Sequence, residues 1–277
     1  MKSLYINLAC GSVYVDNSNW INLDYESSTK SVQQANLLQR LPLDQEIADL
    51  VYSSHFLEHI PKSKVIFFLQ ECFRVLKPGG IIRLVLPDLE EMANNYLFFR
   101  KKEEHAKANF LVLEMIDQCV RNNSGGELGH LYKKISNQKN QDKQMIDFIY
   151  KRTGEDLASK ELETRSANDT LIKKLNYFLS AILRRIEKYR IRIFLLALPK
   201  AFRDQNVSLA GIGELHHWLW DFYTLKKTLE AAGFVDVKRV TAKTSHIKDF
   251  PFSSLDIDNN KLPRKGLESM FIEATKF

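Results

Sequence analysis

Cysteine is scarce in this sequence, and its scarcity excludes a fold held together by disulfides. The 277 residues include 3 cysteines, which are Cys10, Cys72 and Cys119. An odd, widely spaced set of this kind does not form a disulfide framework. We therefore expect a protein of a reducing compartment, with a cytoplasmic location.

Long apolar runs are also absent. No stretch reaches the roughly 18 apolar residues that a membrane-spanning helix requires, and the apolar stretch in MKSLYINLACGS is too short and interrupted for a signal peptide. The sequence has no internal repeat and no low-complexity tract. With 44% hydrophobic and 27% charged residues, its composition is that of an ordinary globular protein.

Length and charge narrow the choice further. A chain of 277 residues suits one α/β domain with a large insertion, or one domain with a helical cap. The formal net charge of +6 favours acidic partners, which include nucleic acid, anionic lipid and phosphorylated substrates. Charge alone does not choose among them.

Alternating strand and helix signals predict an α/β fold. Short apolar runs predict buried strands at residues 4–8, 20–24, 47–53, 81–86, 234–240 and 269–277. Helical spacing of apolar residues predicts one helix within residues 65–76, ended by Lys77-Pro78-Gly79-Gly80, and another at 224–232. This order favours a mostly parallel sheet, whose ligands bind beyond the carboxyl ends of the strands.

Residues 96–213 have a different texture, and we expect them to form a helical insertion on a core made of residues 1–95 and 214–277. The insertion is rich in Lys and Arg and poor in strand signals. It would serve as a substrate lid or as a membrane-facing cap.

The most regular part of the insertion is an amphipathic helix within residues 171–198. Its apolar stripe is Leu171, Leu175, Phe178, Leu179, Ile182, Ile186 and Tyr189, and Lys and Arg surround it. The simpler interpretation, which we favour, is a stripe packed on the core with a solvated basic face. The alternative is contact of residues 171–200 with the inner membrane face or with a lipid-linked, phosphate-bearing glycan. Nucleic acid is disfavoured, because the basic residues are not interleaved with exposed aromatics.

Small or polar residues follow the first strands, where a ligand is expected. The tight turn Ala9-Cys10-Gly11-Ser12 would let a ligand lie against the backbone, although it is also an ordinary strand-end turn. Asp24 could accept both hydroxyls of a ribose, and Asn36 with Leu37 could contact an adenine. The gap between Gly11 and Asp24 is shorter than the roughly 20 residues of a dinucleotide fingerprint, which counts against NAD and against a full first crossover helix.

His55, Glu58 and His59 follow the third predicted strand in the order H-x-x-E-H. This order resembles an inverted zinc motif. We reject a metal site, because that motif needs a long helix and a distant third ligand, whereas this one begins at a strand end. His55 then remains as a candidate base, and both histidines could equally be structural.

Histidine, tryptophan and aspartate are also concentrated in ELHHWLWDFY, residues 214–223. Aromatic and polar side chains of this kind could stack on a ring or a sugar. Trp218, Trp220 and Phe222 could equally anchor the insertion to the core. The sequence leaves both interpretations open.

Taken together, these segments resemble the class I S-adenosylmethionine-dependent methyltransferases, and most of all a small bacterial subfamily associated with cell-surface polysaccharide synthesis. The similar segments are INLACGS, WINLD, ADLVYSSHFLEHIP, FRVLKPGG, IIRLVLPDLE, HHWLWDFYTLKKTLEAAGF and ESMFIEATK. They lie within residues 4–95 and 214–277. The residues between have no such similarity.

The resemblance implies a Rossmann-like, seven-stranded sheet with an antiparallel last strand, and S-adenosylmethionine as cofactor. The implied cofactor-binding residues are Asn7, Ala9, Cys10, Gly11, Asp24, Asn36, Leu37, Ser53, Ser54 and His55. Residues 9–11 would face the methionine part, Asp24 the ribose, and residues 53–55 the sulfonium. Two residues depart from the family pattern: Ala9 stands where Gly is usual, and Asn36 where Asp is common. Alanine is costly at position 9 only if its φ is positive.

These implications predict an O-methyltransferase acting on a saccharide of a surface polysaccharide or glycolipid. Because the methyl group on a sulfonium is already activated, the protein has to align the acceptor and remove its proton. The candidate bases are His55, then His216 or His217, then Asp88, and no metal is required. The alternatives are methylation of another small molecule or a lipid, and a non-catalytic, methyltransferase-like scaffold subunit.

Overall fold

The computed structural model describes residues 3–27, 29–137, 142–157, 185–186, 189–191, 193–200, 207 and 213–277. Most of the predicted amphipathic helix, residues 171–184, lies outside the described residues. Its two described apolar positions, Ile186 and Tyr189, are 50% and 64% exposed. At these two positions the stripe is therefore not packed on the core, contrary to the interpretation that the sequence favoured.

Seven strands of the described chain form one sheet in the order β3-β2-β1-β4-β5-β7-β6. The strands are β1 (Tyr5–Leu8), β2 (Trp20–Asp24), β3 (Val32–Gln34), β4 (Ala48–Ser54), β5 (Leu76–Pro87), β6 (Phe234–Val240) and β7 (Ser269–Lys276). The first five pair in parallel, and β7 runs antiparallel to both β5 and β6. The mostly parallel sheet with an antiparallel last strand is thus confirmed.

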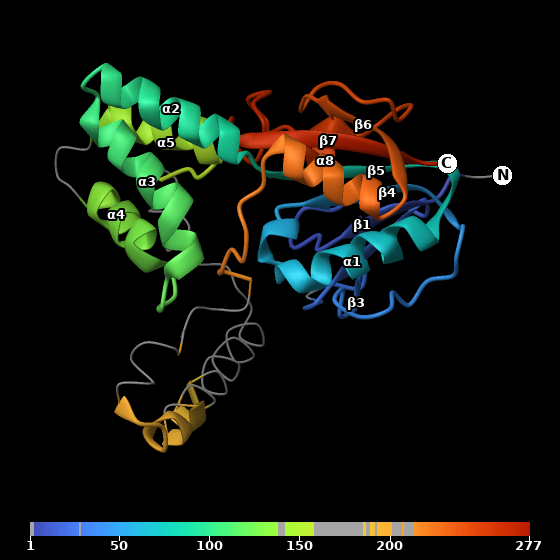
Figure 1. Ribbon diagram of the computed structural model, residues 1–277, viewed down its shortest axis with the longest axis horizontal. Helices are drawn as coiled ribbons and strands as arrows, with labels where there is room; N and C mark the ends of the chain where they lie inside the picture. The colour runs from blue at the N-terminus through green and yellow to red at the C-terminus, as the bar shows by residue number, and fades with distance from the viewer. Residues whose placement is uncertain are drawn as a thin grey trace, which may run out of the picture.

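Two cores cover the two faces of the sheet, because successive side chains of a strand point to opposite faces. On β5, Ile82 and Leu84 face the larger core, to which α1 (Lys62–Val75) and α8 (Phe222–Ala231) contribute. Val85 faces the second core, where Phe250 and the short helix α9 (Phe252–Leu255) pack on the opposite face. Figure 1 shows α1 and α8 side by side on one face of the sheet.

No helix crosses from β1 to β2 in the described chain, as the short gap predicted. The connection instead packs Val13 and Val15 against the second core and is fastened by two buried asparagines. Asn7 Nδ2 donates to Val13 O at 3.1 Å, and Asn22 Nδ2 donates to Val15 O at 3.1 Å. This connection leaves the carboxyl ends of β1 and β2 next to each other without a helix between them.

The insertion begins with four helices that have a small core of their own. They are α2 (Leu89–Lys101), α3 (His105–Val120), α4 (Gly126–Ser136) and α5 (Lys143–Thr153), and they pack around Phe110, Leu128, Met145 and Ile149. Buried Arg152 joins two of them, since it contacts Glu91 at 2.8 Å and Glu114 at 2.5 Å. In Figure 1 these helices lie beyond the carboxyl ends of the parallel strands, and both termini lie at the other end of the sheet.

Four features differ from the sequence-based expectations. Strand β3 was not predicted, because three residues carry too little pattern, and α9 was also missed. Strand β5 begins at Leu76 rather than at residue 81, because the Pro78-Gly79-Gly80 turn is accommodated as an irregularity in its pairing with β4. Helix α2 begins at Leu89, so the helical part starts inside the range predicted for the core. The described residues include no helix with the length and apolarity to span a membrane.

Candidate functional site

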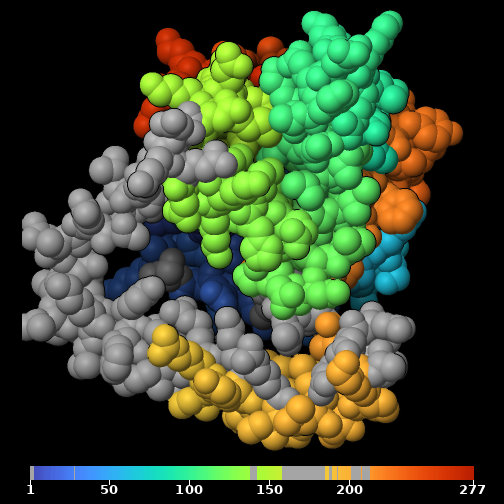
Figure 2. Space-filling view, turned by 90° about the vertical axis from the view of Figure 1, so that its left-hand side faces the viewer, coloured from blue at the N-terminus to red at the C-terminus, as the bar shows by residue number. Residues whose placement is uncertain are grey.

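A cleft of about 570 Å³ opens at the carboxyl ends of β1, β2 and β4. Its lining residues are Ala9, Asp24, Tyr25, Glu26, Asn36, Leu37, Leu38, His55, Phe56, His59 and Gly213. Figure 2 shows the blue N-terminal residues at the bottom of a hollow beneath the green helical part. The cleft has the location expected for a ligand in a parallel sheet, and its size lies in the usual range for a small-molecule site.

Asp24 and the turn after β1 are in direct contact. Asp24 Oδ2 accepts a hydrogen bond from Gly11 N at 2.8 Å, and Oδ1 accepts one from Glu26 N at 3.2 Å. A carboxylate has about four acceptor positions, so each oxygen can accept a further hydroxyl. The residue predicted to bind the ribose and the turn predicted to face the methionine part therefore meet at one edge of the cleft.

Two residues that line the cleft have left-handed backbone conformations although neither is glycine. Ala9 follows β1 with φ of 55°, and His55 follows the neighbouring β4 with φ of 50°. His55 is held there by a hydrogen bond from its N to Val85 O of 2.7 Å. Such conformations cost of order 1 to 3 kcal/mol each and are concentrated at functional sites. Ala9 thus has the positive φ at which alanine is the more costly residue.

The adenine-side residues are also at the cleft. Asn36 Oδ1 accepts a hydrogen bond from Leu38 N at 3.0 Å, which fixes the side chain above the turn. Leu37 is part of the larger core and still lines the cleft. Leu38, which the sequence analysis did not single out, adds a second apolar contact surface beside it.

Five of the predicted cofactor residues do not line the cleft, and one of them is Gly11, whose backbone N donates to Asp24. Asn7 is buried and holds the β1–β2 connection, and Ser53 and Ser54 lie at the end of β4. Cys10 is buried, and burial together with the negative charge of Asp24 raises the pKa of its thiol to about 11. Asn7 and Cys10 therefore stabilise the turn after β1 and do not form part of the cavity wall.

His55 and Glu58 form a pair at the inner end of the cleft. His55 Nδ1 lies 3.4 Å from Glu58 Oε1, and its Nε2 lies 2.9 Å from Ser269 Oγ. Burial, followed by the positive charges of Lys265, His216 and His59, lowers the pKa of His55 well below its usual range. Its imidazole is therefore neutral at neutral pH, with an N–H on one ring nitrogen and a lone pair on the other.

Glu58 is completely buried at the foot of η1 (Leu57–His59). Neither carboxylate oxygen has a hydrogen-bond partner among the described residues. Burial raises the pKa of Glu58 to about 8, against smaller opposing effects of a backbone hydrogen bond and of Lys265. Its backbone oxygen, by contrast, accepts hydrogen bonds from His217 N at 2.7 Å and Trp218 N at 3.4 Å.

The segment before α8 brings His216 to this pair. His216 is buried, its N donates to Gln118 O of α3 at 2.9 Å, and its ring lies 4.6 Å from that of His59, measured between centroids. Burial lowers the pKa of His216 to about 3, and burial also lowers that of His59. His217 is exposed and does not line the cleft.

Asp88 has a structural set of contacts. It caps α2 by accepting from Glu90 N at 3.1 Å, and Arg239 Nη1 donates to its Oδ2 at 2.7 Å. The residue is absent from the cleft lining. Trp220 is buried in the larger core, whereas Trp218 is exposed and lies under Lys62 Nζ, 3.5 Å from the ring centroid.

A known family model matches part of this chain. Residues 12–84 match the family described as "Methyltransferase domain". This range contains Asp24, Asn36 and His55 and ends within β5. No curated protein matches the sequence.

Solved structures of S-adenosylmethionine-dependent methyltransferases are similar to the chain at low identity. One from Mesorhizobium loti is 21% identical over 31% of this chain and 47% of its own, with a TM-score of 0.25. One from Thermotoga maritima is 12% identical over 100% of this chain and 83% of its own, with a TM-score of 0.39. One from Archaeoglobus fulgidus is 12% identical over 99% and 86%, with a TM-score of 0.39. The chain therefore spans about half the length of the first of these relatives, and none of these low scores bears on substrate or mechanism.

Proposed function

This chain contains a class I S-adenosylmethionine-dependent methyltransferase domain, and we propose that it methylates a hydroxyl group. The hydroxyl group belongs to a saccharide of a surface polysaccharide or glycolipid. The observation that carries the proposal is the contact of Asp24 with Gly11 at the edge of a cleft that also presents His55. The saccharide class itself is supported by the sequence resemblance described above.

The cleft fits the cofactor. Asp24 would accept the ribose hydroxyls, while Asn36, Leu37 and Leu38 would contact the adenine from one side. Ala9 and its turn would lie against the methionine part. When bound, S-adenosylmethionine supplies a methyl group on a positively charged sulfur.

His55 would receive the proton of a hydroxyl acceptor. It lines the cleft next to the turn of Ala9, and its side chain is 15% exposed, so one edge of the ring is accessible. Ser269 Oγ lies beside its Nε2 and the Glu58 carboxylate lies beside its Nδ1, and these two contacts fix the orientation of the ring. Alignment of an acceptor oxygen beside this ring is the main task left to the protein.

The helical part would serve as the lid over the acceptor, with a membrane-facing side. Residues 193–196 expose apolar side chains: Ile193 is 67%, Phe194 74% and Leu196 72% exposed. Arg185, Arg190 and Lys200 lie in the same segment and are also exposed. An apolar surface flanked by basic residues suits the interface of an anionic membrane, which would bring the cleft close to a lipid-linked glycan.

Calorimetry with S-adenosylhomocysteine tests the enzyme assignment directly. The wild-type chain should bind the ligand saturably, and Asp24→Ala should remove the binding because the ribose hydroxyls lose their acceptor. Asp16→Ala is the matched control, since Asp16 is an exposed aspartate outside the cleft. No binding by the wild type at millimolar ligand would favour the non-catalytic scaffold and reject the proposal.

A further inference from the structure

Glu58, His59 and His216 bring three potential metal-ligand atoms together. One carboxylate oxygen and two imidazole nitrogens all lie within 4.8 Å of one another. His216 follows the other two by more than 150 residues in the sequence. His216 is thus distant in the sequence, as the third ligand of an inverted zinc motif is.

The cluster has buried polar atoms whose hydrogen-bonding capacity is not used. Both Glu58 oxygens and His216 Nδ1 have no hydrogen-bond partner among the described residues, and the nearest ring atom described above, His55 Nδ1, lies 3.4 Å from Oε1. Glu58 is 0% and His216 is 6% exposed. An unpaired buried carboxylate is costly, and buried polar groups in native proteins are nearly always satisfied. A cation bound by these residues would satisfy buried polar atoms that otherwise have no hydrogen-bond partner.

A backbone carbonyl orients the ring of His59. His59 Nδ1 lies 3.1 Å from Leu215 O, so that Nδ1 donates to this carbonyl and Nε2 keeps its lone pair on the side of Glu58, 4.0 Å from Oε1. A backbone carbonyl on the second ring nitrogen is a usual way to orient a metal-binding histidine.

We propose that Glu58, His59 and His216 bind a divalent transition-metal ion of the Zn²⁺ or Mn²⁺ type at the inner end of the cleft. Two histidines and one glutamate are a common set for a catalytic ion, which keeps a further coordination position open. His59 lines the cleft, so this position faces it. If the proposed function holds, the open position would bind the acceptor hydroxyl and lower its pKa, with His55 receiving the proton.

Direct metal titration tests the site without any need for the acceptor. The full-length chain is stripped with EDTA and titrated in a calorimeter with Zn²⁺, Mn²⁺ and Mg²⁺ in separate experiments. The wild type should bind one equivalent of Zn²⁺ or Mn²⁺ and bind Mg²⁺ more weakly. Co²⁺ should give a visible absorption spectrum of a four- or five-coordinate ion.

Three variants assign the binding to these residues. Glu58→Gln and His216→Asn should each weaken binding by more than the roughly 10- to 100-fold loss typical of outer-shell changes. Glu58→Gln keeps the shape of the buried side chain, so it is the variant expected to fold normally. His217→Asn is the matched control, because His217 is the adjacent exposed histidine, and it should bind as the wild type does.

Two results would overturn the inference: no saturable binding of any of the three ions at millimolar concentration, or equal affinity in the wild type and all three variants. Calorimetry with S-adenosylhomocysteine on the same samples separates this outcome from failure of the proposed function. Retained cofactor binding without metal binding removes the metal site alone. Metal binding without cofactor binding removes the methyltransferase proposal and leaves the site.

Discussion

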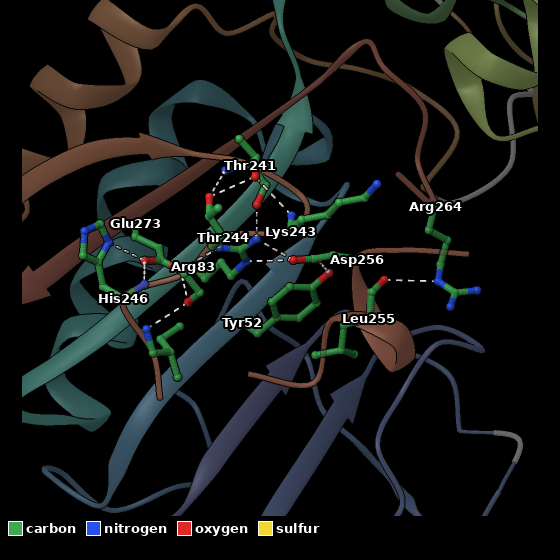
Figure 3. A network of polar contacts seen from close by, with 12 residues as sticks. Tyr52, Arg83, Thr241, Lys243, Thr244, His246, Leu255, Asp256, Arg264 and Glu273 are labelled. Carbon is green, nitrogen blue, oxygen red and sulfur yellow. Dashed lines mark hydrogen bonds and ion pairs between the residues drawn. The ribbon is translucent and has the colours of Figure 1, made fainter. Parts of the chain in front are cut away.

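The guanidinium group of Arg83 and the carboxylate of Asp256 form a completely buried pair, with Nε and Nη2 at 2.8 and 2.6 Å from Oδ2. The contact joins β5 to the end of α9. Glu273 on β7 accepts from Arg83 Nη1 at 2.6 Å, and Tyr52 on β4 donates to Asp256 Oδ1 at 2.7 Å (Figure 3). Arg83 therefore fastens the segment after β6 across three neighbouring strands, on the face where the described chain has only one short helix.

Arg83→Met should destabilise the protein strongly. The change leaves two carboxylates buried without their cation, and breaking a buried ion pair costs about 3–5 kcal/mol. Urea unfolding followed by circular dichroism measures the loss. Lys151→Met is the control, because the Lys151–Asp147 pair is exposed and should contribute at most about 1 kcal/mol. Equal losses in the two variants would contradict a structural role for the buried pair.

Ala9→Gly should stabilise the protein. Its φ of 55° is left-handed, and a residue with a Cβ is destabilised by about 1–2 kcal/mol in that conformation. Glycine removes this cost, but its greater freedom in the unfolded chain cancels part of the gain. A gain in the free energy of unfolding of about 0.5–1 kcal/mol is expected. Ala9→Val should be destabilised, since a β-branched side chain tolerates this conformation worst. A stable Ala9→Val variant would show that the turn relaxes out of the left-handed region.

His55→Asn should slow methyl transfer without weakening cofactor binding. Asparagine accepts the left-handed backbone at position 55 but cannot take up a proton. Turnover on an acceptor saccharide should fall by about 10²- to 10⁴-fold, while the Kd for S-adenosylhomocysteine stays within about twofold. His130→Asn, at an exposed histidine of α4, should keep full turnover. Unchanged turnover in His55→Asn would remove His55 as the base.

Flotation with vesicles that contain an anionic phospholipid tests the membrane-facing side. The wild type should float at low salt and less at high salt, because attraction of basic residues to the surface is screened by ions. Replacing Ile193 and Phe194 together by Ser should reduce flotation, since both side chains are exposed. Val120→Ser on α3, which is 63% exposed, is the control for loss of an exposed apolar group. If the protein does not float, or if neither salt nor the substitutions change flotation, residues 193–196 do not bind a membrane.

The parts of the fold that could be predicted are those in which a local pattern also decides the packing. Strands such as β4 are buried on both faces, so their sequences are apolar runs. Gly233 indicates the end of α8. The short gap between Gly11 and Asp24 correctly indicated that no helix follows β1. Strand β3 could not be predicted, because it is defined by its pairing with β2 and not by its own residues.

The site was predictable where it depends on strand ends and not where it depends on distant segments. Ala9, Asp24, Asn36 and His55 meet at one cleft because their strands are adjacent. The lack of a hydrogen-bond partner for the Glu58 carboxylate could not be predicted, because it depends on the three-dimensional surroundings of the side chain and not on any local sequence pattern. The exposure of Ile186 and Tyr189 likewise depends on which residues pack against them, and helical spacing does not predict those contacts.

The strap of residues 216–218 has contacts on both of its sides, with Gln118 O of α3 on one and Glu58 O on the other. A hinge movement that lifts α3 away from the sheet must either carry His216 with it or break the bond to Gln118. A movement that admits a bulky molecule would therefore also change the position of His216 at the inner end of the cleft. Opening would withdraw a histidine, and closure would return it.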